Sequence, residues 1–128
     1  MPSSFRLLVL KSNKDEIATL QSILQQNFPN WTYYIFMEKE ELLRFLEQEN
    51  TVSLLLLDSE MSEGESLDLL RQLRLLQSGE LLPIVGFCPN ASLATTNALI
   101  LGGTTTFFQK PTTTEALLNL LKKLPAFT

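Results

Sequence analysis

The stretch that decides the fold is Leu54-Leu55-Leu56-Leu57-Asp58, in which four consecutive leucines end on a carboxylate. A short, fully apolar run bounded by polar residues is typical of a strand that is buried on both faces of a sheet. Such strands occur in parallel sheets that are covered by helices on both sides. The run therefore predicts an α/β fold with Asp58 at the carboxyl end of a central strand.

The rest of the chain alternates between short apolar runs and segments in which apolar residues recur at helical spacing. The predicted strands are Arg6–Leu10, Thr32–Phe36, Val52–Leu57, Ile84–Phe87 and Thr105–Phe108. The predicted helices cover about residues 13–28, 39–48, 65–76 and 91–101, and a last helix begins at residue 113 or 114. This pattern predicts a doubly wound, five-stranded parallel sheet in a single domain, residues 1–128.

The composition narrows the classes of function that fit the chain. With 128 residues, 45% of them hydrophobic, the chain is long enough for one core. One cysteine and no histidine exclude an internal disulfide and histidine-based catalysis or zinc sites. The net charge of −4 argues against a nucleic-acid surface. Because no apolar stretch approaches the roughly 18 residues of a membrane span and no secretory signal is evident, we expect a cytoplasmic protein that binds neither nucleic acid nor membrane.

Four residues that can carry chemistry follow or end the predicted strands. They are Lys11, Asp58, Cys88 and Lys110. The carboxyl ends of parallel strands meet at one edge of the sheet, where folds of this class bind their ligands. The sequence therefore predicts that these four residues converge on one site.

The start of the first helix has the pattern of a capping box. Asn13 is followed three residues later by Glu16, and Asp15 lies between them. Carboxylates in the first turn stabilise a helix through its dipole and its free N–H groups. Asp15 and Glu16 are therefore interpreted as helix-start residues rather than as metal ligands.

The spacing of the strand-end residues points to a family. Cys88 lies 30 residues after Asp58, Phe107 lies 19 residues after Cys88, and Lys110-Pro111 begins three residues after Phe107. This arrangement resembles the receiver domains of two-component response regulators, and the resemblance covers essentially the whole chain. It implies a flavodoxin-like fold with strand order 2-1-3-4-5 and a cis peptide between Lys110 and Pro111.

The resemblance also implies a role for each matched residue. Asp58 matches the aspartate that accepts a phosphoryl group from a histidine kinase, and Lys110 matches the lysine that pairs with the phosphate. Cys88 and Phe107 match the positions that switch after phosphorylation. In this family a magnesium ion, held partly by an acidic pair after the first strand, neutralises charge on the transferring group.

The chain departs from the family pattern at the acidic pair and at the switch. Lys11 and Ser12 stand where the two carboxylates are expected. A lysine repels a divalent ion, so we expect weak or absent magnesium binding and no cofactor. Cys88 offers only a weak thiol donor and Phe107 has no hydroxyl, so phosphorylation is expected to be poorly transmitted.

Three interpretations of the function follow. The leading one is a degenerate receiver, or pseudo-receiver, that acts in a two-component-type pathway by protein–protein interaction and not as an enzyme. Asp58 would then pair with Lys110 and Lys11. The alternative is a phosphorylation-competent response regulator that accepts a phosphoryl group on Asp58 from a histidine kinase. A flavodoxin-like enzyme or cofactor carrier is disfavoured, because residues 11–14 contain no glycine to wrap a phosphate.

Residues 81–109 contain no charged residue. In receivers the fourth helix, the fifth strand and the fifth helix form the face that contacts partners or pairs in dimers. A neutral exposed face suits a contact surface better than a solvated rim. We therefore expect a protein partner or a second copy of the chain to bind at this face, with Thr95 and Leu99 among its exposed residues.

Overall fold

The computed structural model describes residues 5–48, 51–58, 63–76, 82–88 and 105–127. In chain order the elements are β1 (Arg6–Lys11), α1 (Lys14–Asn27), β2 (Thr32–Phe36), α2 (Lys39–Gln48), β3 (Leu54–Asp58), α3 (Glu63–Leu75), β4 (Ile84–Cys88), β5 (Thr105–Gln109) and α5 (Thr114–Lys123), followed by a short 3₁₀ helix at Leu124–Phe127. None of the helices in these ranges is both long and apolar enough to cross a membrane.

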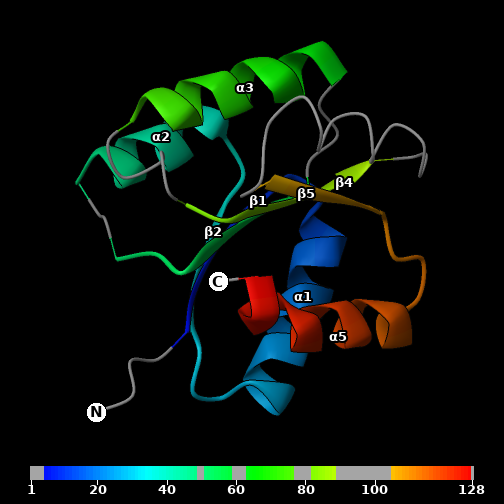
Figure 1. The fold of residues 1–128 in the computed structure, drawn as a ribbon. Coiled ribbons are helices and arrows are strands. Elements are labelled where there is room, and N and C mark those ends of the chain that lie inside the picture. The colour runs from blue at the N-terminus through cyan, green and yellow to red at the C-terminus, as the bar shows by residue number, and fades with distance from the viewer. Residues whose placement is uncertain (1–4, 49–50, 59–62, 77–81, 89–104, 128) are drawn as a thin grey trace.

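The strands described form one parallel sheet in the order β2-β1-β3-β4-β5. This confirms the doubly wound topology and the strand order that the family resemblance implies. Helices α2 and α3 cover one face of the sheet, and α1 and α5 cover the other (Figure 1). The central strands β1 and β3 are therefore shielded on both sides, as the leucine run of β3 predicts.

Each strand contributes alternate side chains to two separate cores, because successive residues of a strand point to opposite faces. On the side of α2 and α3 the strand residues are Leu8, Leu10, Leu55, Leu57 and Ile84. On the side of α1 and α5 they are Leu7, Val9, Leu54, Leu56 and Val85. Lys11 and Asp58 continue the second series by one further step, so the alternation directs both towards α1 and α5.

The register of β1 against β3 brings the two strand ends together. Leu7 lies opposite Leu54, and the pairing continues to Lys11 opposite Asp58. Both end residues belong to the strands, although the sequence pattern placed the ends of these strands one residue earlier. Lys11 and Asp58 are thus neighbours across the ladder, and the sheet itself fixes their backbone positions.

Capping residues mark the starts of α1 and α5, and the cap at Asn13 is the one that the sequence predicts. The side chain of Asn13 accepts a hydrogen bond of 3.0 Å from the N–H of Glu16 at the start of α1, and Thr113 accepts one of 3.0 Å from the N–H of Ala116 at the start of α5. These bonds satisfy N–H groups that have no partner inside a helix. The predicted helix over residues 91–101 lies outside the described residues.

Phe107 is partly buried and packs against the core beside α2 and α3, on the opposite face of the sheet from Lys11 and Asp58. Its ring fills the space above Gly86, where an added Cβ would come within 2.6 Å of a ring carbon. Glycine at this position of β4 therefore leaves room for the aromatic ring of β5. The side chain at this switch position is thus partly buried between β4 and the core beside α2 and α3.

Candidate functional site

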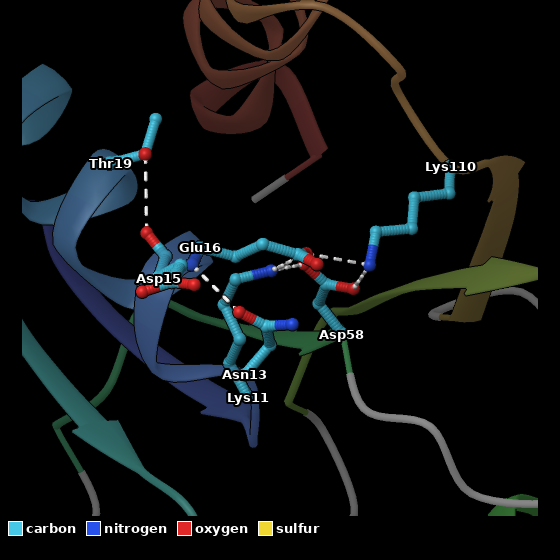
Figure 2. Close-up of polar contacts among 7 residues, drawn as sticks. All are labelled: Lys11, Asn13, Asp15, Glu16, Thr19, Asp58 and Lys110. Carbon is cyan, nitrogen blue, oxygen red and sulfur yellow. Dashed lines mark hydrogen bonds and ion pairs between the residues drawn. The ribbon is translucent and has the colours of Figure 1, made fainter.

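Four charged side chains meet at the carboxyl end of the sheet: Lys11, Glu16, Asp58 and Lys110 (Figure 2). We call them the charged quartet. Lys11 Nζ contacts Asp58 Oδ2 and lies 2.9 Å from Glu16 Oε1. Lys110 Nζ lies 2.7 Å from Glu16 Oε1 and 3.1 Å from Asp58 Oδ1. Each lysine therefore bridges the same two carboxylates.

The local fold explains why these four side chains converge. Lys11 and Asp58 end adjacent strands and point to the face that α1 covers. Glu16 lies in the first turn of α1, which starts only a short loop after β1, so its carboxylate reaches back over the strand ends. Lys110 follows β5 directly and reaches towards Asp58 from the far side of the site.

The quartet has an inner pair and an outer pair. The side chains of Lys11 and Asp58 are 4% and 8% exposed, whereas those of Glu16 and Lys110 are 38% and 40% exposed. Charges removed from water are tolerated only when they are paired and hydrogen-bonded. Here the buried carboxylate is matched on both of its oxygens, because Oδ2 accepts from Lys11 and Oδ1 from Lys110.

The outer pair is ionised at neutral pH. The pKa of the Glu16 carboxyl is lowered from 4.5 to about 2, first because Lys110 donates a hydrogen bond to it and then because Lys11 does. Burial alone would lower the pKa of the Lys110 ammonium, but the hydrogen bonds and charges of Glu16 and Asp58 outweigh burial and raise it. Both outer groups therefore add charge-assisted bonds to the site.

The shifted pKa of Glu16 predicts a pH dependence of stability. A carboxyl whose pKa is lower in the folded state stabilises the fold above its unfolded pKa and loses that contribution as the pH falls. Relative to Glu16→Gln, the protein should thus be more stable above pH 4.5, with the difference vanishing towards pH 2. Because Glu16 is partly exposed, we expect a difference of only about 1 kcal/mol. Urea unfolding of both proteins across this pH range measures it.

Asp15→Asn is the matched control for this prediction, because Asp15 lies in the same helical turn and is exposed. This control removes one carboxylate from the helix start without touching the quartet. A difference between parent and Glu16→Gln that stays constant from pH 4.5 to pH 2 would contradict the assignment.

A pocket of about 500 Å³ opens beside the quartet on the α1 and α5 side of the sheet. It is lined by the quartet together with Thr19, Phe87, residues 111–114 and Leu117. The exposed faces of Glu16 and Lys110 border this space, while Lys11 and Asp58 are almost inaccessible. A small molecule that enters the pocket can thus meet the outer pair without opening the inner pair.

The structure brings some of the predicted site residues together and places others elsewhere. It brings Lys11, Asp58 and Lys110 into contact, whereas Ser12 is exposed. Cys88 ends β4 opposite Gln109 on β5. Phe107 packs against the core beside α2 and α3, on the other face of the sheet. The candidate site therefore contains the predicted lysines and aspartate but neither Ser12 nor the ring of Phe107.

Glu16 is the site residue that sequence reasoning missed. The interpretation as a helix-start residue is correct for its backbone N–H, which donates a hydrogen bond to Asn13 Oδ1. It is incomplete for its carboxylate, which binds both lysines. A signal was present in the sequence, since Glu16 lies in the first turn of a helix that follows the strand ending at Lys11. A carboxylate so placed can reach the same sheet edge.

Three solved structures show what the chain is similar to, whereas no family model and no curated protein matches it. The receiver domain of a sensor histidine kinase from Pseudomonas aeruginosa, with magnesium coordinated in its active site cleft, is 17% identical, with a TM-score of 0.69 and 96% of this chain and 98% of that one covered. A response regulator from Hahella chejuensis is 17% identical, with a TM-score of 0.77 and coverage of 97% and 94%. The phosphorylated cyanobacterial phytochrome response regulator RcpA is 16% identical, with a TM-score of 0.75 and coverage of 97% and 93%.

Lys11 fills the space between the carboxylates of Glu16 and Asp58, and this arrangement does not fit a magnesium ion. Within the described ranges, no group of three or more His, Cys, Asp and Glu side chains could hold a metal. The two carboxylates that do meet, from Glu16 and Asp58, already bind the ammonium group of Lys11. A divalent ion between them would collide with that group and be repelled by its charge.

The likeness extends over nearly the full length of each chain, at sequence identities below one fifth. It rests on the same features that the structure shows, namely five parallel strands in the order 2-1-3-4-5 with helices on both faces. The chain therefore has the fold of the receiver domains of two-component signalling proteins.

Proposed function

We propose that this chain is a signalling receiver-like domain that acts by protein–protein interaction in a two-component-type pathway, with impaired magnesium-dependent phosphorylation of Asp58. The observation that carries the proposal is the state of Asp58. Its side chain is 8% exposed, and each of its carboxylate oxygens is bound by a lysine. The proposal includes the predictions that the chain is cytoplasmic, that it is not an enzyme and that it uses no cofactor.

The ion pairs of Asp58 oppose phosphorylation in two ways. An aspartate that accepts a phosphoryl group must present a free oxygen in line with the bond that breaks, so at least one contact to Lys11 or Lys110 has to be given up first. Positioning and charge neutralisation by metal supply most of the catalysis in phosphoryl transfer. With Lys11 in the inner pair, we expect that contribution to be small.

The alternative is a phosphorylation-competent response regulator in which a histidine kinase phosphorylates Asp58. One observation favours it: the contact of 3.1 Å between Lys110 and Asp58 preserves the lysine–aspartate pair that the family resemblance requires. In this case Lys110, which is 40% exposed, would shift to the phosphoryl group. Cys88 and Phe107 as switch positions, and the cis Lys110–Pro111 peptide, stay predictions under either function.

The interaction surface that we propose combines the uncharged stretch of residues 81–109 with α5. Part of this face lies outside the described residues, including Thr95 and Leu99. Its described part includes the exposed residues Gln109 on β5 and Ala116 and Asn119 on α5. A partner protein or a second copy of the chain would cover it.

Charged substitutions test this surface. We expect Thr95→Glu and Leu99→Glu to weaken self-association or partner binding about tenfold or more, because an unpaired carboxylate in a contact surface is costly to desolvate. Sedimentation velocity over a range of concentrations, followed by pull-down of partners with each variant as bait, measures the change. Gln21→Glu, on the exposed face of α1, is the control. Association and binding that are the same in all three variants and the parent would contradict the proposed surface.

A further inference from the structure

Lys11 takes the position that a bound cation would occupy between two carboxylates. Its ammonium group contacts Asp58 Oδ2 and lies 2.9 Å from Glu16 Oε1, and its side chain is only 4% exposed (Figure 2). The two carboxylates come from different elements, β3 and α1, and converge on this one nitrogen. The inner end of the site is thus built around a single positive charge that belongs to the chain.

We infer that the Lys11 ammonium is a tethered cation that replaces a divalent ion, and that Glu16 and Asp58 form a divalent-cation site as soon as Lys11 is removed. This inference rests on the proposed function, because it explains why Asp58 would do without magnesium. One carboxylate of the inferred site, that of Glu16, lies in α1, whereas the acidic pair of the family directly follows the first strand.

The charges of the quartet support this inference. With all four groups ionised, two ammonium groups balance two carboxylates. Removal of Lys11 leaves two carboxylates, one of them 8% exposed, with Lys110 as their shared partner. Two carboxylates held this close repel one another unless a cation lies between them. Without Lys11 the site therefore has two negative charges and only one positive charge.

The chemistry of the remaining oxygens suits a hard divalent cation. Magnesium is typically held by one or two carboxylates and keeps several of its water ligands. Glu16 and Asp58 supply the carboxylates, and the space left by the Lys11 side chain joins a pocket of about 500 Å³ that can hold the waters. Lys110 binds Oδ1 of Asp58, whereas Lys11 binds Oδ2. Removal of Lys11 therefore leaves Oδ2 available to a cation.

Calorimetric titration of Lys11→Ala with magnesium chloride, in parallel with the parent protein, tests the inference. We expect the variant to bind magnesium at least about tenfold more tightly, because a repelling charge within contact distance is gone. Manganese should bind at the same site and be detected by loss of its free electron paramagnetic resonance signal. In the double variant Lys11→Ala/Glu16→Gln the gain should be lost, since one of the two carboxylates is missing.

Lys14→Ala is the matched control, because it removes the same charge from an exposed position of α1. If Lys11→Ala is unfolded without metal, magnesium or manganese should restore its helical circular dichroism, since a cation that binds only the folded state stabilises it. A folded Lys11→Ala that binds magnesium no better than the parent or Lys14→Ala would overturn the inference. So would an unfolded variant that neither cation refolds.

Failure of this inference can be told apart from failure of the proposed function. The titrations contain no phosphodonor, and their readouts are cation affinity and folding. A parent protein that is phosphorylated on Asp58 would contradict the proposed function yet leave the role of Lys11 and Glu16 to be decided by the titrations. Failure of the titrations would leave impaired phosphorylation to be decided by its own assay.

Discussion

Replacement of Asp58 by alanine should lower the free energy of unfolding by about 3–5 kcal/mol, the range for loss of one partner from a buried ion pair. The reason is Lys11, whose side chain is 4% exposed and whose ammonium group would lose Asp58 and keep its contact to Glu16. Lys110 would lose less, because it is 40% exposed and retains Glu16. For a domain of this size such a loss is a large share of the total stability.

Urea unfolding followed by fluorescence measures this effect. The chain has one tryptophan, Trp31, whose ring stacks on Phe28 with a centroid distance of 4.1 Å and lies 4.5 Å from the ring of Phe5. These rings belong to the core beside α1 and α5 and separate on unfolding. The tryptophan is therefore an internal probe that none of the proposed substitutions alters.

Asp68→Ala is the matched control for Asp58→Ala. Asp68 also pairs with a cation, at 3.4 Å from Arg71, but both side chains are more than two thirds exposed. Exposed ion pairs of this kind contribute about 0–1 kcal/mol. A loss in Asp58→Ala no greater than that in Asp68→Ala would contradict the description of Lys11 and Asp58 as a buried, interdependent pair.

A second substitution separates lost pairing from lost packing. In the double variant Lys11→Met/Asp58→Leu, apolar side chains replace both members of the inner pair. Exchange of a buried pair for apolar residues is often neutral or stabilising, whereas removal of one partner is not. We therefore expect the double variant to be more stable than Asp58→Ala.

The sequence was sufficient to predict the sheet and the approach of its strand ends. The apolar run of residues 54–57 is typical of a strand that is covered on both faces. The alternation of side chains along such a strand directs Asp58 to the same side as Leu54 and Leu56. The same alternation in β1 directs Lys11 to that side. Once the two strands pair in parallel with Leu7 opposite Leu54, Lys11 lies opposite Asp58. Both side chains then point to the same face, because side chains alternate along a strand.

The role of Glu16 could not be predicted in the same way. The capping pattern already explains why a glutamate occurs at this position. The alternation that fixes the direction of side chains in a strand does not apply to a side chain in the first turn of a helix. Whether it caps the helix or reaches the sheet edge depends on how α1 leaves β1, which is a tertiary property. The packing of Phe107 over Gly86 likewise depends on the register of β4 and β5, which short apolar runs do not specify.

The quartet ties together elements that are distant in the chain. Lys11 belongs to β1, Glu16 to α1, Asp58 to β3, and Lys110 follows β5. Phosphorylation of Asp58 would have to break at least one of its contacts to Lys11 and Lys110, while a divalent ion is repelled by Lys11. In contrast, binding through a surface elsewhere on the domain requires no such rearrangement, so the proposed interaction function is compatible with an intact quartet.

Asp58 of the parent protein should resist phosphorylation by a small phosphodonor. Incubation with a small acyl phosphate should leave the parent protein without a phosphoryl adduct, whether or not magnesium is present. The reason is that both carboxylate oxygens of Asp58 are held by lysines and that the inner lysine repels the metal. Asp58→Asn is the control, because it removes the acceptor while keeping a side chain of the same shape.

Intact-mass spectrometry of the parent and of Asp58→Asn after this incubation, with and without magnesium, decides whether Asp58 accepts a phosphoryl group. We predict that neither protein gains the mass of a phosphoryl group under either condition. A magnesium-dependent gain on the parent that is absent from Asp58→Asn would contradict the claim and identify the chain as a phosphorylation-competent response regulator.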